Sequence, residues 1–165
     1  MKKLFAIALT ALAVAGCVAP RPTVAVKTKF DPAEHAAYLA KGSTKVTGQA
    51  FLRQQGGGTV TCAGARAVLL PATAYFREST DLLVKGSTVD NKDNKPGPAY
   101  SGLLRETRCD AQGNFEFEGV PAGRYIVMSE VSWVIASSRQ GGLVRREVNV
   151  VEGGSNRFLL SDADR

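Results

Sequence analysis

The sequence predicts an all-β fold: a seven-stranded β-sandwich with a short N-terminal helix and a helical and loop insertion. The first reason is that the hydrophobic period changes to two from Thr44 onward, as in strands whose side chains alternate between two faces. The second is that short apolar runs are separated by glycine, proline and asparagine, which favour turns. The third is length, because 165 residues, 44% of them hydrophobic, suit one globular domain.

Seven runs have the length and residue types of strands. They lie at 44–52, 65–70, 103–109, 114–118, 124–131, 144–151 and 155–160. Alternation along each run predicts the side chains that face the core. These are Val46, Ala50, Leu52, Ala67, Leu69, Phe115, Phe117, Tyr125, Val127, Val144, Val148, Val150, Phe158 and Leu160.

A short helix is predicted at 30–42, ahead of the first strand. Asp31 can cap the free amides, Pro32 suits the first turn, and Gly42 ends the segment. A helix this short is not stable by itself, so its alanines should pack against the domain. The chain's one histidine, His35, lies near the exposed helix start and is expected at the surface.

The stretch 72–102 separates the second predicted strand from the third. Thr73–Val84 has the composition of a short helix, and Val89–Pro98 that of a mobile polar loop. Long loops in compact domains are often functional. A partner-binding surface is therefore expected in this insertion.

The N-terminus has the organisation of a bacterial export signal. Two lysines precede an apolar run of 12 residues, which is too short for a membrane-spanning helix of about 20 residues. The run ends in Val14-Ala15-Gly16-Cys17, which resembles the bacterial lipobox. The resemblance implies a signal peptide at 1–16 and a lipid on Cys17. In the alternative interpretation, an ordinary secretory signal is cut nearby and Cys17 is incidental.

The segment 17–29 contains two prolines and no sustained period, which is typical of an extended linker. Removal of 1–16 lowers the formal net charge from +6 to +4, because two lysines leave with it. Val18 follows the cysteine in place of aspartate. In the lipoprotein family this implies attachment to the outer membrane, facing the periplasm.

Two cysteines remain, Cys62 and Cys109, and an exported protein meets oxidising conditions in which they can pair. Cys62 comes just before one predicted strand and Cys109 ends another, so antiparallel neighbours would bring them together. The alternative is two separate buried thiols. A metal site is disfavoured, since one histidine and two cysteines do not supply four ligands.

A further resemblance is carried by the stretch 110–127, Asp-Ala-Gln-Gly-Asn-Phe-Glu-Phe-Glu-Gly-Val-Pro-Ala-Gly-Arg-Tyr-Ile-Val. It contains two tight turns, each followed by alternating core residues. The stretch resembles the hallmark of carboxypeptidase regulatory-like domains, as 46–50 and 63–71 resemble their first two strands. The resemblance implies a transthyretin-like (prealbumin-like) sandwich at 43–165 with an insertion at 72–102. It implies no activity, since function resides in sites grafted onto a fold.

Motifs of hydrolases, zinc peptidases and phosphate-binding loops are missing from the sequence. The transthyretin-like enzymes need several histidines or a paired His/Tyr iron set, which one histidine cannot supply. We therefore expect no catalytic residue, no cofactor and no metal, although an unrecognised hydrolase stays open. Nucleic-acid binding is not expected, because the adjacent Arg145 and Arg146 would point to opposite faces of a strand.

Two functions agree with these observations. The favoured one is a noncatalytic, periplasm-facing lipoprotein that binds or scaffolds an envelope protein assembly. The alternative is a lipoprotein that binds carbohydrate or cell wall through exposed aromatic side chains. The candidate partner surface contains Tyr75, Phe76, Tyr100 and Trp133. For Trp133, packing on the helix at 32–41 is the competing interpretation.

Overall fold

The structure, a computed structural model, describes residues 20–92, 94, 97 and 99–165. The signal peptide expected at 1–16 and the lipid-carrying Cys17 lie outside the described residues. Within the described part of the chain, no helix combines the length and apolar character needed to cross a membrane.

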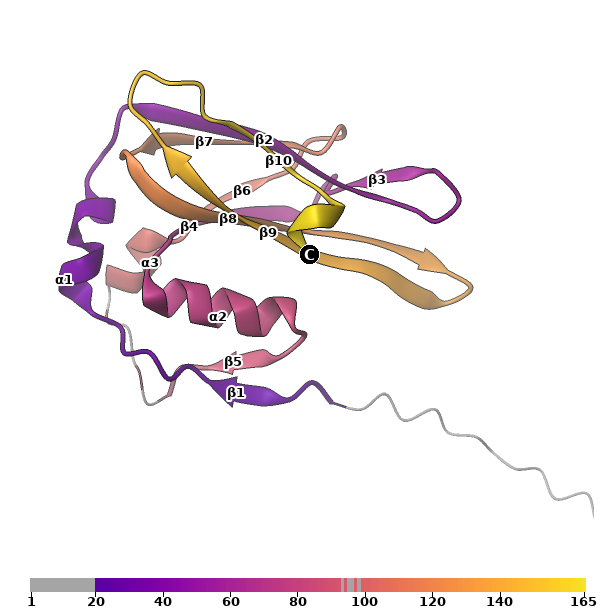
Figure 1. The fold of residues 1–165 in the computed structure, drawn as a ribbon, viewed down its shortest axis with the longest axis horizontal. Coiled ribbons are helices and arrows are strands. Elements are labelled where there is room, and N and C mark those ends of the chain that lie inside the picture. The colour runs from indigo at the N-terminus through magenta and orange to yellow at the C-terminus, as the bar shows by residue number, and fades with distance from the viewer. Residues whose placement is uncertain (1–19, 93, 95–96, 98) are drawn as a thin grey trace, which may run out of the picture.

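Two four-stranded sheets pack face to face as a β-sandwich, which confirms the predicted all-β class (Figure 1). The predicted number of seven strands is too low, because the short strand β3 next to the glycine-rich turn was not recognised. In the first sheet, β2 is the central strand: β10 pairs with it in parallel, and β7 and β3 pair with successive parts of it. Its strands are β2 (Thr44–Arg53), β3 (Thr59–Thr61), β7 (Asn114–Val120) and β10 (Arg157–Leu160). The second sheet has the order β6-β4-β8-β9 and is antiparallel. Its strands are β4 (Arg66–Pro71), β6 (Arg105–Arg108), β8 (Gly123–Ile135) and β9 (Ser138–Val150).

The main core lies between the sheets and contains the side chains that the alternation predicts. All but one of the predicted inward-facing residues are buried, and Phe158 is partly buried against the same cluster. Gly48 on β2 lets the Phe115 ring approach closely, since a Cβ at this glycine would lie 2.3 Å from the ring carbon Cζ. The in-and-out pattern of the strands was therefore readable from the sequence.

A third layer covers the outer face of the second sheet (Figure 1). It consists of α2 (Ala74–Val84), α3 (Ala99–Leu103), β1 (Thr23–Ala25) and β5 (Thr88–Asp90). Arg77 on α2 lies 2.8 Å from the carboxylate of Glu147 on β9, and this hydrogen-bonded pair holds the pKa of Glu147 at about 2. The helix predicted in the insertion is thus confirmed and is fixed to the sheet.

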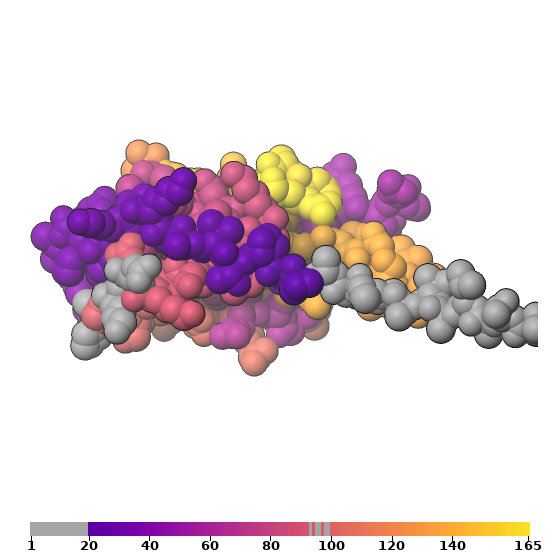
Figure 2. Space-filling model, turned by 90° about the horizontal axis from the view of Figure 1, so that it is seen from below, coloured from indigo at the N-terminus to yellow at the C-terminus, as the bar shows by residue number. Residues whose placement is uncertain are grey.

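The segment 17–29, expected as an extended linker, packs on the body in its second half. β1 pairs in parallel with β5, and Val26 is buried. The Glu78 carboxylate on α2 accepts hydrogen bonds of 2.8 Å from the backbone amides of Lys27 and Thr28. The chain therefore lies along the body from Thr23 onward, because distant residues supply partners for its backbone (Figure 2).

The segment before the first sandwich strand is helical, as predicted, in two short pieces. These are α1 (Pro32–His35) and the 3-10 helix η1 (Ala36–Leu39). The alanines of this segment are exposed, contrary to the expectation, and His35 and Tyr38 make the contact with the domain instead. Asp31 caps the first piece by accepting from the Ala33 amide at 2.9 Å. His35 is fully buried, not at the surface as expected, because its ring stacks on Phe30 at 4.3 Å and is enclosed by α2.

All seven predicted runs contain strands, with different boundaries. β6 begins at Arg105, because the residues up to Leu103 belong to α3. β8 and β9 extend well beyond the predicted ends, joined by a two-residue turn in which Ala136 and Ser137 have positive φ angles of 45° and 67°. The sequence did not indicate this turn, since it lacks the glycine or asparagine typical of such positions. The polar loop expected at Val89–Pro98 begins instead with strand residues of β5; residues 93, 95–96 and 98 lie outside the described part. The chain ends in the 3-10 turn η2 (Asp162–Asp164).

Candidate binding cleft

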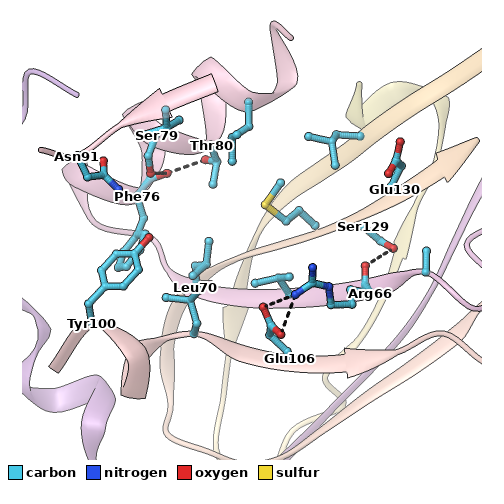
Figure 3. A pocket seen from close by; sticks show the side chains of 17 residues that line it. Arg66, Leu70, Phe76, Ser79, Thr80, Asn91, Tyr100, Glu106, Ser129 and Glu130 are labelled. Atoms are coloured by element: carbon cyan, nitrogen blue, oxygen red, sulfur yellow. Dashed lines mark hydrogen bonds and ion pairs between the residues drawn. The ribbon is translucent and has the colours of Figure 1, made fainter. Parts of the chain in front are cut away.

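A cleft of about 450 Å³ opens between α2 and the outer face of the second sheet (Figure 3). Its walls come from the insertion on one side and from β4, β6, β8 and β9 on the other. The aliphatic and thioether side chains of the lining are Val68, Leu70, Leu83, Val89, Leu104, Met128 and Leu143. A cleft of this size and lining falls within the range of protein ligand sites.

The floor of the cleft follows from the sequence of β4. Residues 67–72 form an unbroken apolar run, which is typical of a strand covered on both faces. Ala67 and Leu69 enter the core between the sheets, whereas Val68 and Leu70 point outward into the cleft. The same run therefore supplies one face to the sandwich and one to the cleft.

The roof of the cleft is the inner face of α2. Phe76, Thr80 and Leu83 recur at helical spacing and line the cleft together. The hydroxyls of Ser79 and Thr80 donate to the Phe76 carbonyl oxygen at 3.2 and 2.6 Å. Because these hydroxyls are satisfied within the helix, the roof is apolar in effect.

An aromatic cluster closes one end of the cleft. Phe76 and Tyr100 stack at a centroid distance of 5.6 Å, and Tyr75 packs edge-on against both. Burial raises the pKa of Tyr75 to about 12, and its hydroxyl has no partner among the described residues. Burial also raises the pKa of Tyr100, which lines the cleft and is partly exposed.

The mouth of the cleft carries charged and polar side chains. Arg66 and Glu106 form an ion pair at 3.3 Å, and Glu130 is paired with Arg139. At the aromatic end, Asn91 Oδ1 is buried without a hydrogen-bond partner among the residues that the structure describes. Figure 3 shows Asn91 and Tyr100 at one end and the charged groups across the opening, so the cleft is apolar inside and polar at its edge.

The structure separates the four aromatic residues predicted to form a partner surface. Tyr75 and Phe76 are 0% and 1% exposed, because α2 turns this face onto the sheet, so the expectation of an exposed platform is wrong for them. Tyr100 lines the cleft. Trp133 does not line the cleft and is partly buried against the core between the sheets. It does not pack on the helix at 32–41, since β8 ends at the opposite end of the molecule from α1 (Figure 1).

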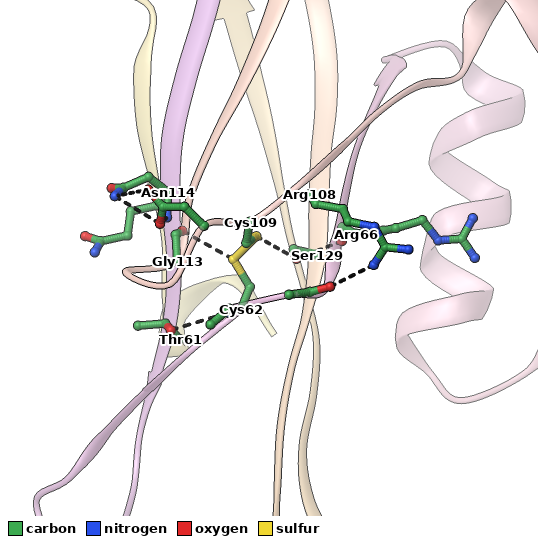
Figure 4. The surroundings of a disulfide bond; sticks show 12 residues. Thr61, Cys62, Arg66, Arg108, Cys109, Gly113, Asn114 and Ser129 are labelled. Carbon is green, nitrogen blue, oxygen red and sulfur yellow. Dashed lines mark hydrogen bonds between the residues drawn. A yellow bond between two sulfur atoms is a disulfide. The ribbon is translucent and has the colours of Figure 1, made fainter.

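The predicted disulfide Cys62–Cys109 is confirmed (Figure 4). Cys62 follows β3 of the first sheet and Cys109 follows β6 of the second, with their Cα atoms 5.8 Å apart. Both residues are buried, and the Ser129 hydroxyl lies 3.7 Å from the Cys109 sulfur. The bond therefore joins the two sheets. Across residues 20–92, 94, 97 and 99–165, no three His, Cys, Asp or Glu side chains gather closely enough to hold a metal ion.

Comparison with known proteins places the fold among β-sandwiches. No family model and no curated protein matches the sequence. The crystal structure of a candidate carbohydrate-binding protein of Pseudomonas aeruginosa matches 81% of this chain and 98% of its own, with a TM-score of 0.65 and 24% identity. The major pilin subunit of Bacillus cereus matches 73% of this chain and 29% of its own, with a TM-score of 0.40 and 12% identity. The Pseudomonas structure thus shows that this chain shares an established β-sandwich fold.

Proposed function

We propose that this protein is a noncatalytic binding module of the bacterial cell envelope whose cleft holds an apolar segment of a protein partner. The observation that carries the proposal is the open apolar cleft between α2 and the second sheet, with ionic groups at its mouth. Apolar clefts with a few polar groups at the edge are the usual form of binding sites.

A protein segment fits the lining better than a sugar does. Aliphatic and thioether side chains from β4, β5, β8, β9 and α2 dominate the cleft, and they would bury the side chains of a partner. At the mouth, Glu106 and Glu130 can accept hydrogen bonds from the amides of a bound segment, and Arg66 can donate to its carbonyl groups. The polar groups at the edge would then fix the orientation of the bound segment, and the apolar floor would supply most of the affinity for it.

The cellular location of the protein is part of the proposal. The run that ends in Gly16-Cys17 favours a lipoprotein attached to the outer membrane and facing the periplasm. The disulfide between Cys62 and Cys109 agrees with an oxidising compartment. The stretch 110–127 and the sandwich around it favour kinship with carboxypeptidase regulatory-like domains of transthyretin-like fold.

Glycan binding is the second candidate function. It is favoured by Tyr100, a partly buried tyrosine that lines the cleft at the same end as Asn91, since sugars pack on aromatic rings and bond to side-chain amides. The description of the Pseudomonas neighbour as a candidate carbohydrate-binding protein points the same way. Trp133, Tyr75 and Phe76 are not part of this proposed sugar site. Trp133 packs against the core between the sheets, and Tyr75 and Phe76 are buried.

A cleft-filling substitution tests the site. Val68→Trp places a large side chain on the floor, whereas Leu159→Trp, at an exposed position on the other sheet, is the matched control. A photo-reactive residue at Leu143 should crosslink a specific envelope protein in intact cells. Val68→Trp should lower this yield by about tenfold or more, and Leu159→Trp should not.

The two candidate functions give different results in this experiment. If peptidoglycan fragments bind the purified protein and Tyr100→Ala loses this binding, the ligand of the cleft is a glycan and not a protein segment. Equal crosslinking in both tryptophan variants would overturn the cleft as the site. Urea unfolding of each variant checks that the domain remains folded.

A further inference from the structure

The hairpin of β8 and β9 projects beyond the sandwich. Each strand has 13 residues, and the register pairs Gly123 through Ile135 with Val150 through Ser138 without a break. β4 supports β8 only as far as Ser129. The rest of the hairpin is a two-stranded ribbon that reaches outward from one end of the molecule (Figure 1).

The tip of this ribbon is apolar and exposed. Val134 is 70% exposed and Ile135 is 55% exposed, which makes them the most exposed large hydrophobic residues described. The eight residues from Val131 to Ser138 carry no charge. Glu130 and Arg139, which flank this stretch, form an ion pair with each other.

The backbone of the tip limits how deeply it can insert. Alternate amides and carbonyls bond across the hairpin up to Ile135 and Ser138, but beyond Ser129 no described strand pairs with the outer edge of either strand. Because open sheet edges are costly in hydrocarbon, the tip suits the headgroup boundary of a membrane and not the bilayer core. The exposed Val134 and Ile135 side chains can contact this boundary.

The path of the chain ahead of β1 indicates which surface contacts the tip. β1 begins at Thr23, so five residues lie between it and Cys17, and the six Cα-to-Cα steps reach roughly 20 Å when extended. The chain enters β1 from the end of the molecule toward which the ribbon projects (Figures 1 and 2). Arg21, which is exposed just before β1, can contact anionic headgroups. A lipid on Cys17 would therefore hold this end of the body close to the bilayer.

We propose that the ribbon tip, Val134 to Ser137, docks on the membrane that carries the lipid anchor, with Val134 and Ile135 in the boundary between headgroups and acyl chains. This inference rests on the proposed lipidation of Cys17. The anchor and the tip form two attachments at one end of the body. They fix its orientation, with the α1 end directed away from the bilayer.

The only tryptophan of the chain, Trp133, immediately precedes the tip and is a probe of the distance between the tip and lipid. The acylated protein is reconstituted into phosphatidylethanolamine and phosphatidylglycerol vesicles that contain lipid brominated in the upper acyl chain. We expect the brominated lipid to quench Trp133 emission. Val134→Asp/Ile135→Asp should remove most of the quenching, whereas the charge-matched control Val151→Asp/Leu159→Asp, at exposed positions elsewhere, should keep it.

Measurement of the intact mass distinguishes a failure of the membrane docking from a failure of the lipid anchor. An acylated protein whose Trp133 is not quenched, or is quenched equally in both double variants, overturns the docking of the tip alone. A chain without an acyl group overturns the anchor and the docking that depends on it. A dimer in solution that the tip substitutions abolish also overturns lipid docking, because a second copy would then cover the tip.

Discussion

The Nε2 atom of His35 lies 2.8 Å from Oγ1 of Thr73, although the two residues are 38 positions apart in the sequence. Nδ1 of the same ring donates to the Asp31 carbonyl oxygen at 2.6 Å, so Nε2 accepts from the Thr73 hydroxyl. Thr73 immediately precedes α2. One buried imidazole therefore joins the N-terminal helix to the start of the helix that roofs the cleft.

Replacement of His35 by alanine should lower the free energy of unfolding by about 2–4 kcal/mol, because it removes a fully buried ring and leaves polar groups unpaired. His35→Asn keeps a donor near the Nδ1 position and should recover part of the loss. Urea unfolding followed by circular dichroism measures both. A loss below about 1 kcal/mol for the alanine variant would show that the ring contributes little.

Removal of the bond between Cys62 and Cys109 should destabilise the domain. The two residues are 47 positions apart, and the chain-entropy model gives about 4 kcal/mol for a loop of this length. We expect the Cys62→Ala/Cys109→Ala variant to unfold at a correspondingly lower urea concentration. A reductant should destabilise the native protein and leave the double variant unchanged. Equal sensitivity to reductant in both would contradict the prediction.

Acid should loosen the segment 23–29 before the sandwich unfolds. Hydrogen bonds from the Thr28 side chain and from the Lys27 and Thr28 amides lower the pKa of Glu78. A lowered pKa stabilises the attachment above the ordinary carboxyl pKa, and the stabilisation is lost as the pH falls through the lowered value. Amide hydrogen exchange should therefore accelerate at 23–29 in acid.

The variant Glu78→Ala should show fast exchange at 23–29 already at neutral pH, because the acceptor is absent. Glu152→Ala, which removes an exposed carboxylate from another loop, is the control and should leave this segment protected. Slow exchange at neutral pH in Glu78→Ala would mean that pairing with β5 alone holds the segment.

Gly48 should tolerate no side chain. A Cβ there would lie 2.3 Å from the Phe115 ring and 2.5 Å from the Phe158 carbonyl oxygen, so Gly48→Ala should lower stability by about 1–3 kcal/mol. Gly56→Ala is the matched control, because a Cβ at that turn residue meets nothing within 4 Å. Thermal unfolding of both variants measures the difference. Equal melting temperatures would show that β2 and Phe115 can move apart at low cost.

The sandwich was largely predictable from local pattern. Alternation along each strand fixes which side chains enter the core, since a shift by one residue would expose the whole set. Val46 and Phe117, which pair across two strands of the first sheet, both belong to the predicted inward face. The disulfide was predictable as a pairing of the two remaining cysteines, with separate thiols as the alternative.

The cleft was predictable only in part. The insertion was expected to carry the partner surface, and it does supply the roof of the cleft. Its aromatic residues were expected to face outward, but amphipathic spacing on α2 shows only which residues share a face. The neighbour that covers this face is decided by the fold.

By itself, the sequence determined the all-β class, the inward faces of the strands and the helix of the insertion, because these follow from periods of two and 3.6 residues. Only the tertiary structure decided that 23–29 lies on the body, that His35 is buried and that α2 covers the second sheet. It also decided that the β8–β9 ribbon continues to an exposed tip at Val134 and Ile135. These features depend on contacts between residues far apart in the chain, whose partners no local pattern specifies.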